Sequence, residues 1–286
     1  MEPIRINSEL PLTMLDRNLD LNEYDFVLFH LYKAYPEYRE YYKQLRETHP
    51  ERIMIFDNSA YEFFVKGEQL NLEEYAQAVI DLRPDYYILP DKLMDKQATL
   101  DMTFTFMAVH ELNIIRAFAN TGKIVPKPLA VAQGNSAKEL FSCLLKYHEE
   151  KIRNVALPFH NSFFKDGYSP YENRMRLEFG RLTEDHKYML GRHWFIKSAE
   201  MLLREFEHVH LLGSHCPFEK RLYEEAGFDF IKTMDTGYPV KCAIAGYELF
   251  KESEKPNIII DEFMTTQLTQ EQQSLIDINI NKFKAL

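Results

Sequence analysis

The chain has 286 residues, of which 45% are hydrophobic and 14% aromatic, so it can bury one large core. Its formal net charge of -10 argues against a generally basic protein that coats nucleic acid, although it leaves room for a local basic groove. The three cysteines form no CxxC pair, which argues against a zinc site of the usual spacing and against a disulfide framework.

Short apolar runs alternate with amphipathic segments along the chain, which is the pattern of repeated βα units. The expected strands are 26–31, 52–57, 86–91, 128–133, 154–159, 208–213 and 228–235. The expected helices are 37–47, 72–82, 98–112, 136–150, 194–207 and 217–227. Asn71 is a suitable N-cap for the second of these helices, and Gly227 a suitable C-cap for the last.

An eighth strand is needed to close a barrel, and we expect it either at 256–261 or near the N-terminus. No Pro/Gly/Ser linker or internal repeat divides the chain. We therefore predict fold class α/β, a (β/α)8 TIM barrel forming a single domain over residues 1–286. A long loop and helical insertion is expected around 160–206, and a helix at the C-terminus.

Four of the expected strands end in polar residues, namely Asp57, Asp91, Gln133 and Asp235. Barrel enzymes place their active sites at these carboxyl ends. Asp57 and Asp235 suggest a carboxylate pair in which one attacks an anomeric carbon and the other manages the proton. An aspartate at a strand end is also a common turn or capping residue, and that alternative stays open for each.

Several motifs resemble segments of the tRNA-guanine transglycosylases. FDNSAYE (56–62) resembles their DSGG(Y/F)Q motif, with Asn58, Ser59, Ala60 and Glu62 as departures. YYILPD (86–91) resembles the strand whose aspartate contacts the incoming base, and LAVAQGN (129–135) resembles the GIVQGG strand. HLLG (210–213) and AGFDFIKTMDTGYP (226–239) are similar to the LMG and nucleophile segments.

The chain also departs from that family. It has no closely spaced cysteines for the family's C-terminal zinc site and no clear counterpart of the basic helix that grips tRNA. This pattern is more similar to the zinc-less relatives that place 7-deazaguanine derivatives into phage and bacterial DNA. The resemblance implies a transglycosylase that exchanges guanine in nucleic acid for a 7-deazaguanine base, with DNA slightly favoured over tRNA.

The resemblance also implies the roles of individual residues. Asp235 would be the nucleophile that holds the glycosyl group covalently, and Asp57 the general acid/base for the leaving and entering bases. Asp91 and Gln133 would bond the purine edge, because a carboxylate accepts from N1–H and the 2-amino group and an amide donates to O6. The remaining substrate-binding candidates are Asn58, Tyr61, Gly134, Leu157, Leu212 and Gly213, of which Tyr61 and Leu212 would cover the two faces of the base.

Each supporting residue also has a simpler interpretation. Tyr61 could be a core aromatic, Leu212 part of the barrel core, and Gln133-Gly134 an ordinary turn. The histidines lack a metal-binding HxxxH spacing, so we interpret them as core or surface residues and expect no metal and no cofactor; they are His160, His208, His210 and His215.

The expected partners are nucleic acid, DNA or tRNA, with a flipped guanine, and a free base such as 7-cyano-7-deazaguanine. Lys92, Lys96, Lys127, Lys232 and Lys241 are candidate phosphate contacts, although a solvated surface lysine is the commoner case. We expect no membrane partner and a cytoplasmic location, in the host if the chain is phage-encoded. The oligomeric state stays open. Two alternatives remain: an N-glycoside hydrolase using the same aspartates, or an inactive barrel serving as a binding subunit.

Overall fold

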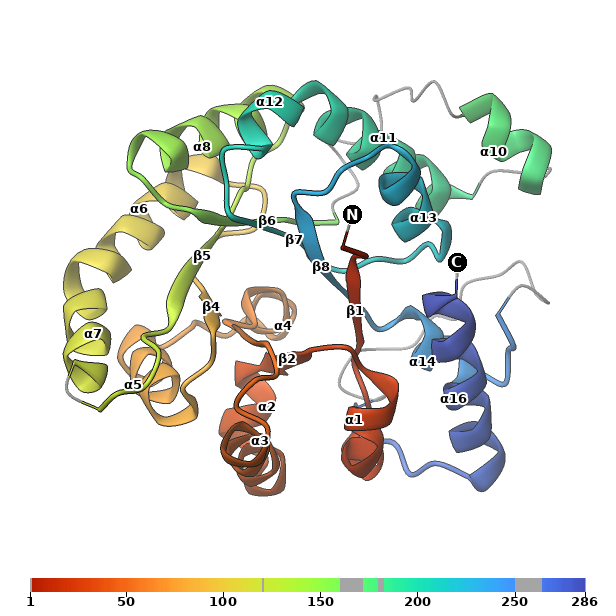
Figure 1. The fold of residues 1–286 in the computed structure, drawn as a ribbon, viewed down its shortest axis with the longest axis horizontal. Helices are drawn as coiled ribbons and strands as arrows, with labels where there is room; N and C mark the ends of the chain where they lie inside the picture. Colours follow the sequence, from red (N-terminus) through yellow and green to blue (C-terminus); the bar gives the residue numbers. More distant parts are fainter. Residues whose placement is uncertain (1, 120, 160–171, 180–182, 250–263, 286) are drawn as a thin grey trace. The chain divides into compact units, whose positions relative to one another are not determined.

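A computed structural model describes residues 2–119, 121–159, 172–179, 183–249 and 264–285 (Figure 1). Within these residues, eight parallel strands form one sheet in the order β1-β8-β7-β6-β5-β4-β3-β2. The strands are β1 (Arg5–Ser8), β2 (Asp25–Leu28), β3 (Met54–Asp57), β4 (Tyr86–Ile88), β5 (Lys127–Val131), β6 (Asn154–Leu157), β7 (His208–Leu211) and β8 (Ile231–Thr236). With helices between successive strands, this order confirms the α/β class and the (β/α)8 TIM barrel.

The first strand of the sheet is the N-terminal segment Arg5–Ser8, which pairs in parallel with β8. One of the two expected sources of the eighth strand is therefore correct. The other, 256–261, lies outside the described residues.

The helices mostly fall where the amphipathic pattern predicts them. In chain order they are the 3-10 helix η1 (Leu12–Arg17), α1 (Asn18–Leu21), α2 (Phe29–Ala34), α3 (Pro36–Thr48), α4 (Ala60–Lys66), α5 (Leu72–Leu82), α6 (Lys96–Phe106), the π-helix η2 (Met107–Glu111), α7 (Leu112–Phe118), α8 (Ala137–Glu149), α10 (Glu172–Phe179), α11 (Glu184–Ser198), α12 (Glu200–Leu203), α13 (Phe218–Glu225), α14 (Tyr238–Ile244) and α16 (Gln270–Lys284). Asn71 caps α5 by accepting from the backbone N–H groups of Glu73 and Glu74, as predicted. Gly227 follows α13 with φ of 76°, as expected for a residue that ends a helix.

Some expected boundaries are wrong. The strand expected at 26–31 stops at Leu28, because Phe29 already begins α2. The helix expected at 194–207 begins earlier, at Glu184, and is followed by the short α12. The strand expected at 228–235 begins only at Ile231. The boundaries at Leu28 and Ile231 lie in apolar runs, where hydrophobic periodicity alone does not distinguish a strand from a buried helix. The start of α11 lies in the polar segment 183–187, where Thr183 caps the helix.

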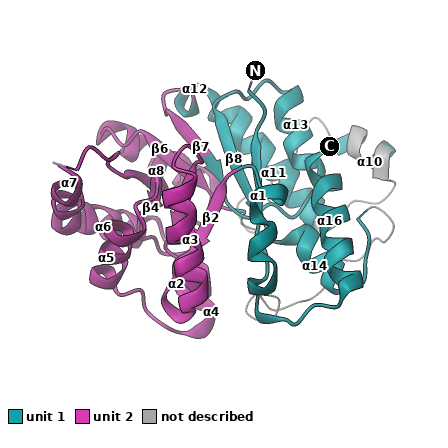
Figure 2. Cartoon of the chain, turned by 60° about the horizontal axis from the view of Figure 1, so that its bottom comes forward, with its two compact units in different colours: residues 1–23, 159–203, 210–286 teal, residues 24–158, 204–209 magenta. Residues whose placement is uncertain are grey.

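The chain divides into two compact units (Figure 2). One consists of residues 1–23, 159–203 and 210–286, and the other of residues 24–158 and 204–209. We call them unit 1 and unit 2, and describe each by itself. One of the boundaries between the units falls within β7, after Val209.

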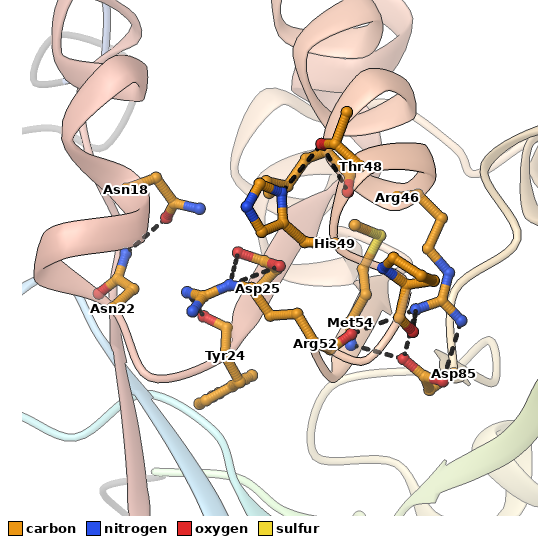
Figure 3. Close-up of polar contacts among 12 residues, drawn as sticks. Asn18, Asn22, Tyr24, Asp25, Arg46, Thr48, His49, Arg52, Met54 and Asp85 are labelled. Carbon is orange, nitrogen blue, oxygen red and sulfur yellow. Dashed lines mark hydrogen bonds and ion pairs between the residues drawn. The ribbon is translucent and has the colours of Figure 1, made fainter.

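In unit 2, side chains fasten the amino ends of neighbouring strands (Figure 3). The guanidinium of Arg46 donates to both carboxylate oxygens of Asp85, each at 3.0 Å, and Asp85 accepts from the Met54 backbone N–H at 2.8 Å. Arg52 Nε lies 2.9 Å from Oδ2 of Asp25, the first residue of β2. These contacts hold the starts of β2, β3 and β4 in register. They lie at the amino ends of the strands, which in barrels usually contribute to stability and not to catalysis.

In unit 1, buried asparagines tie loops to the sheet and to the C-terminal helix. Asn22 accepts from the Ser8 backbone N–H at 2.7 Å and donates to its carbonyl at 2.9 Å. Asn279 on α16 donates to the carbonyls of Pro239 and Tyr247 and accepts from the N–H of Leu249. The expected C-terminal helix is thus present, and it packs against α14.

All three cysteines, Cys143, Cys216 and Cys242, are buried free thiols. In the part of the chain that the structure describes, no helix combines the length and apolarity needed to cross a membrane.

Candidate functional site

Three of the sequence-predicted polar residues meet at the carboxyl ends of β3, β4 and β5 in unit 2. β3 pairs in parallel with β4, and β4 with β5, so their carboxyl ends lie side by side. Asn58 follows β3 directly, whereas Asp91 and Gln133 lie three and two residues beyond the ends of β4 and β5. The strands are shorter than expected, but their polar ends do converge.

Asp91 is held between two amides. Asn58 Nδ2 donates to its Oδ1 at 2.9 Å, and Gln133 Nε2 donates to its Oδ2 at 2.8 Å. The amide oxygens are also engaged, because Asn58 Oδ1 accepts from the Ala60 N–H and Gln133 Oε1 from the Met94 N–H. These bonds fix the orientation of both amides, so that each presents its N–H group to the carboxylate.

Burial sets the electrostatics of this cluster. Only 8% of Asp91 and 1% of Asn58 and Gln133 is exposed. Burial raises the pKa of the Asp91 carboxyl, and the hydrogen bonds from Asn58 and Gln133 oppose that rise. A carboxylate in this setting retains lone pairs for a further donor while its own position is fixed.

Asp57 ends β3 and is half-buried. Its Oδ2 accepts from the backbone N–H of Ser59 at 2.7 Å. Ser59 has φ of 59°, in the left-handed region, and its hydroxyl contacts both the backbone N and Nδ1 of His30. Burial raises the pKa of Tyr75 well above its usual range, and the nearby charges of Asp57 and Asp91 add to this. The Tyr75 hydroxyl donates to carbonyl groups of β3 and β4, beneath these acids.

Three further candidates in unit 2 lie in different surroundings. Tyr61 on α4 is 52% exposed, so its interpretation as a core aromatic is wrong. Gly134 has a packing role, because a Cβ there would lie 2.7 Å from the Glu139 Cβ. Leu157, the last residue of β6, is fully buried.

Asp235 lies in unit 1, on β8 and beside Asn7 of β1. Its side chain is 3% exposed, and both carboxylate oxygens accept from the backbone N–H of Gly213, at 3.0 and 3.1 Å. Gly213 has φ of 61°, which favours glycine and lets the turn after β7 aim its N–H at the acid. Leu212, in the same turn, is half-buried.

His210 was interpreted from the sequence as a core or surface residue, and the structure places it in the core, beside Asp235. It lies on β7 in unit 1, fully buried, with Nε2 3.1 Å from Oδ1 of Asp235 and Nδ1 2.8 Å from Oγ1 of Thr233. The signal was the alternation in HVHLLG and KTMD, which places His210, Thr233 and Asp235 on one face of neighbouring strands.

The other histidines lie elsewhere. His208 is buried with its ring 4.5 Å from that of Tyr86, and His215 packs on Phe159. His160 lies outside the described residues. Among the residues that are described, no group of three or more His, Cys, Asp or Glu side chains could hold a metal ion.

Asp57 belongs to unit 2 and Asp235 to unit 1, so the joint action of the two acids stays a prediction. No known family model matches the chain, and no curated protein is significantly similar to it in sequence. The likeness to guanine transglycosylases therefore depends on the motifs themselves.

Proposed function

We propose that this protein exchanges guanine in a nucleic acid, DNA in preference to tRNA, for a free 7-deazaguanine base through a covalent aspartyl-glycosyl intermediate. The Asn58–Asp91–Gln133 cluster is the observation that carries the proposal. A guanine-type ring presents N1–H and the 2-amino group side by side, with O6 next to them. Asp91 can accept from the two donors, and the second hydrogen of the Gln133 amide can be donated to O6.

Asp235 has the properties that a nucleophile requires. Its carboxylate is buried and oriented by the Gly213 N–H, so little reorganisation is needed before attack. In the proposed first step, a carboxylate oxygen bonds to C1′ while the C1′–N9 bond breaks, and guanine takes a proton from Asp57. In the second step, the entering base loses a proton to Asp57 and its N9 displaces the carboxylate.

The preference for DNA follows from what the sequence lacks. Closely spaced cysteines and a basic helix for gripping tRNA are missing, and the net charge of -10 disfavours broad contact with a folded polyanion. A single flipped nucleotide needs only a few phosphate contacts around it.

The test combines the purified protein with guanine-containing DNA or tRNA and 7-cyano-7-deazaguanine. We expect an adduct that survives a denaturing gel, release of labelled guanine and incorporation of the free base, all with DNA. Asp235→Asn should abolish the adduct because it removes the nucleophile. Asp57→Asn should slow exchange by roughly 10²- to 10⁴-fold, the usual contribution of a general acid/base.

Asp229→Asn is the matched control, since Asp229 is an exposed acid just before β8. It should exchange at the wild-type rate. Guanine release without incorporation would instead identify a hydrolase. Exchange confined to tRNA would overturn the DNA preference. Unchanged exchange in Asp235→Asn would contradict the mechanism.

A further inference from the structure

Asp235 has a second neighbour whose chemistry goes beyond the proposed roles. The imidazole of His210 lies between Asp235 and Thr233, at 3.1 Å from Oδ1 and 2.8 Å from Oγ1. All three side chains belong to unit 1, and none is more than 3% exposed. In such a dry setting the electrostatic interaction of a polar group with a charged one is strong.

The acid determines the tautomer of the histidine. Nε2 of His210 lies 3.1 Å from Oδ1 of Asp235 without the alignment of a hydrogen bond. An ionised carboxylate has no hydrogen to donate, so a hydrogen on Nε2 is what makes this close contact favourable. Nδ1 is then an acceptor, and the Thr233 hydroxyl is the donor that matches it. A hydrogen on Nε2 therefore matches both neighbours, and the Thr233 hydroxyl, which can donate or accept, orients the ring.

We propose that His210, oriented by Thr233, is a positioning residue that stabilises the Asp235 carboxylate as it leaves the glycosyl group. This rests on the proposed function, in which Asp235 is the nucleophile. Nε2 of His210 contacts Oδ1, so in the proposed step Oδ2 is the oxygen that bonds C1′. The Gly213 N–H is shared between the two oxygens and does not make this distinction by itself.

His210 should affect the second half of the reaction, in which the adduct is resolved, more than the first. When the Oδ2–C1′ bond breaks, its electron pair returns to the carboxylate, and N9 of the entering base bonds C1′. A donor to Oδ1 stabilises the charge that develops there, so it accelerates this second half most. His210 keeps its proton throughout, so no additional acid or base is required.

The test measures decay of the preformed adduct. Enzyme and guanine-containing DNA are first incubated without a free base, then 7-cyano-7-deazaguanine is added, and loss of the adduct is followed on denaturing gels. At saturating base, His210→Leu should slow this loss roughly 10- to 100-fold, the usual effect of a hydrogen bond to a charged group. The base concentration for half-saturation should not change, because the Asp91 cluster is untouched.

Conservative variants separate this role from a structural one. His210→Gln retains an N–H donor and should recover most of the rate. Thr233→Val should lose part of it because the ring is no longer oriented by the contact with Oγ1. His208→Leu is the matched control, because His208 lies on the same strand and the same face as His210 but packs on Tyr86. It should lower thermal stability without changing the decay rate. If His210→Leu does not fold, Thr233→Val and His210→Gln give the answer.

The outcomes separate the two proposals. Wild-type decay in His210→Leu or Thr233→Val, together with loss of the adduct in Asp235→Asn, would overturn the role of His210 alone. An adduct that persists in Asp235→Asn would overturn the proposed function itself.

Discussion

At the scale of single residues, His193 shows how burial couples charge to stability. It lies on α11 with 1% exposure. Its ring is stacked on that of Tyr223, with centroids 5.9 Å apart, and is tilted against that of Phe228, with centroids 5.5 Å apart. Burial lowers the pKa of His193 to about 4, and the charge of Lys197 contributes to the shift. The native state therefore keeps this imidazole neutral at pH values where an exposed one would be charged.

Lowering the pH should reduce the free energy of unfolding because of His193. The unfolded chain binds a proton near pH 6.5 and the native state only near pH 4, so stability is lost as pH falls between these values. The loss from His193 should reach up to about 3 kcal/mol. Urea denaturation at pH 7 and pH 4.5 should show a smaller difference for His193→Phe than for wild type. Lys197→Gln should also reduce it, but less. Equal pH dependence in His193→Phe and wild type would contradict this account.

The residues differ in how well the sequence could predict them. Asp91 and Gln133 were found because each ends an apolar run that was expected to form a strand, and parallel strands bring such ends together. Asn58 was a candidate only through the resemblance of FDNSAYE to the transglycosylase motif. His210 was interpreted only as a core or surface residue, because a histidine in an apolar run is usually one. Its role depends on the register between neighbouring strands, which one sequence does not provide.

At the scale of elements, a buried ion pair joins helices α11 and α13 to the turn that contacts Asp235. Arg192 Nε lies 2.7 Å from Oε1 of Glu219, and both side chains are fully buried. Arg192 Nη1 donates to the carbonyl of Leu212, and Ser214 Oγ donates to Glu219 Oε2 at 2.6 Å. The pair therefore holds both sides of Gly213.

Breaking this pair should be costly for the fold. Glu219→Leu leaves Arg192 charged and buried, and should reduce the free energy of unfolding by about 3 to 5 kcal/mol. The double variant Arg192→Met/Glu219→Leu should lose much less than the sum of the single variants, because no buried charge remains. Chemical denaturation of the three variants measures this coupling. Additive losses would show that the two side chains do not interact.

Element types were easier to predict than element ends. α5 matches its predicted range because Asn71 caps its start and its apolar residues recur at helical spacing. The segment from Lys96 to Phe118 was harder, since the π-helix η2 separates α6 from α7. A π-turn needs one extra residue in the helix, and hydrophobic spacing alone does not reveal it.

At the scale of the whole molecule, the net charge of -10 limits how the protein can hold a polyanion. Binding must depend on a few local cations rather than on a broad basic surface. Lys92 is a candidate: it follows Asp91, is exposed, and its Nζ lies 5.9 Å from the ring centroid of Phe64, which is itself 57% exposed.

The salt dependence of DNA binding tests whether Lys92 contacts a phosphate. If Lys92 contacts one phosphate, Lys92→Gln should weaken DNA binding and reduce the slope of log K against log salt by about 0.7 to 0.9. Lys146→Gln is the control, since Lys146 on α8 already pairs with Glu149 and Glu150. Fluorescence anisotropy titrations at several salt concentrations give both slopes. Equal slopes for the two variants would remove Lys92 from the interface.

The class of fold was predictable from the sequence because it depends on a repeated pattern. Seven strands with six helices between them were visible in the hydrophobic pattern, and a parallel barrel is a common solution for such a chain. The missing strand was ambiguous because Arg5–Ser8 is only four residues long, with a single fully apolar position.

The turn after Asp57 has a consequence for how this protein could change. A serine in the left-handed region costs about 1 to 2 kcal/mol relative to glycine, the residue that the resembled motif has at this point. Here the Ser59 hydroxyl contacts the backbone and the ring of His30, which lies just beyond the previous strand. Backbone conformational energy alone would favour glycine at position 59. The Ser59 side chain connects two successive βα repeats, so a mutation in either repeat can change the conformation of the other.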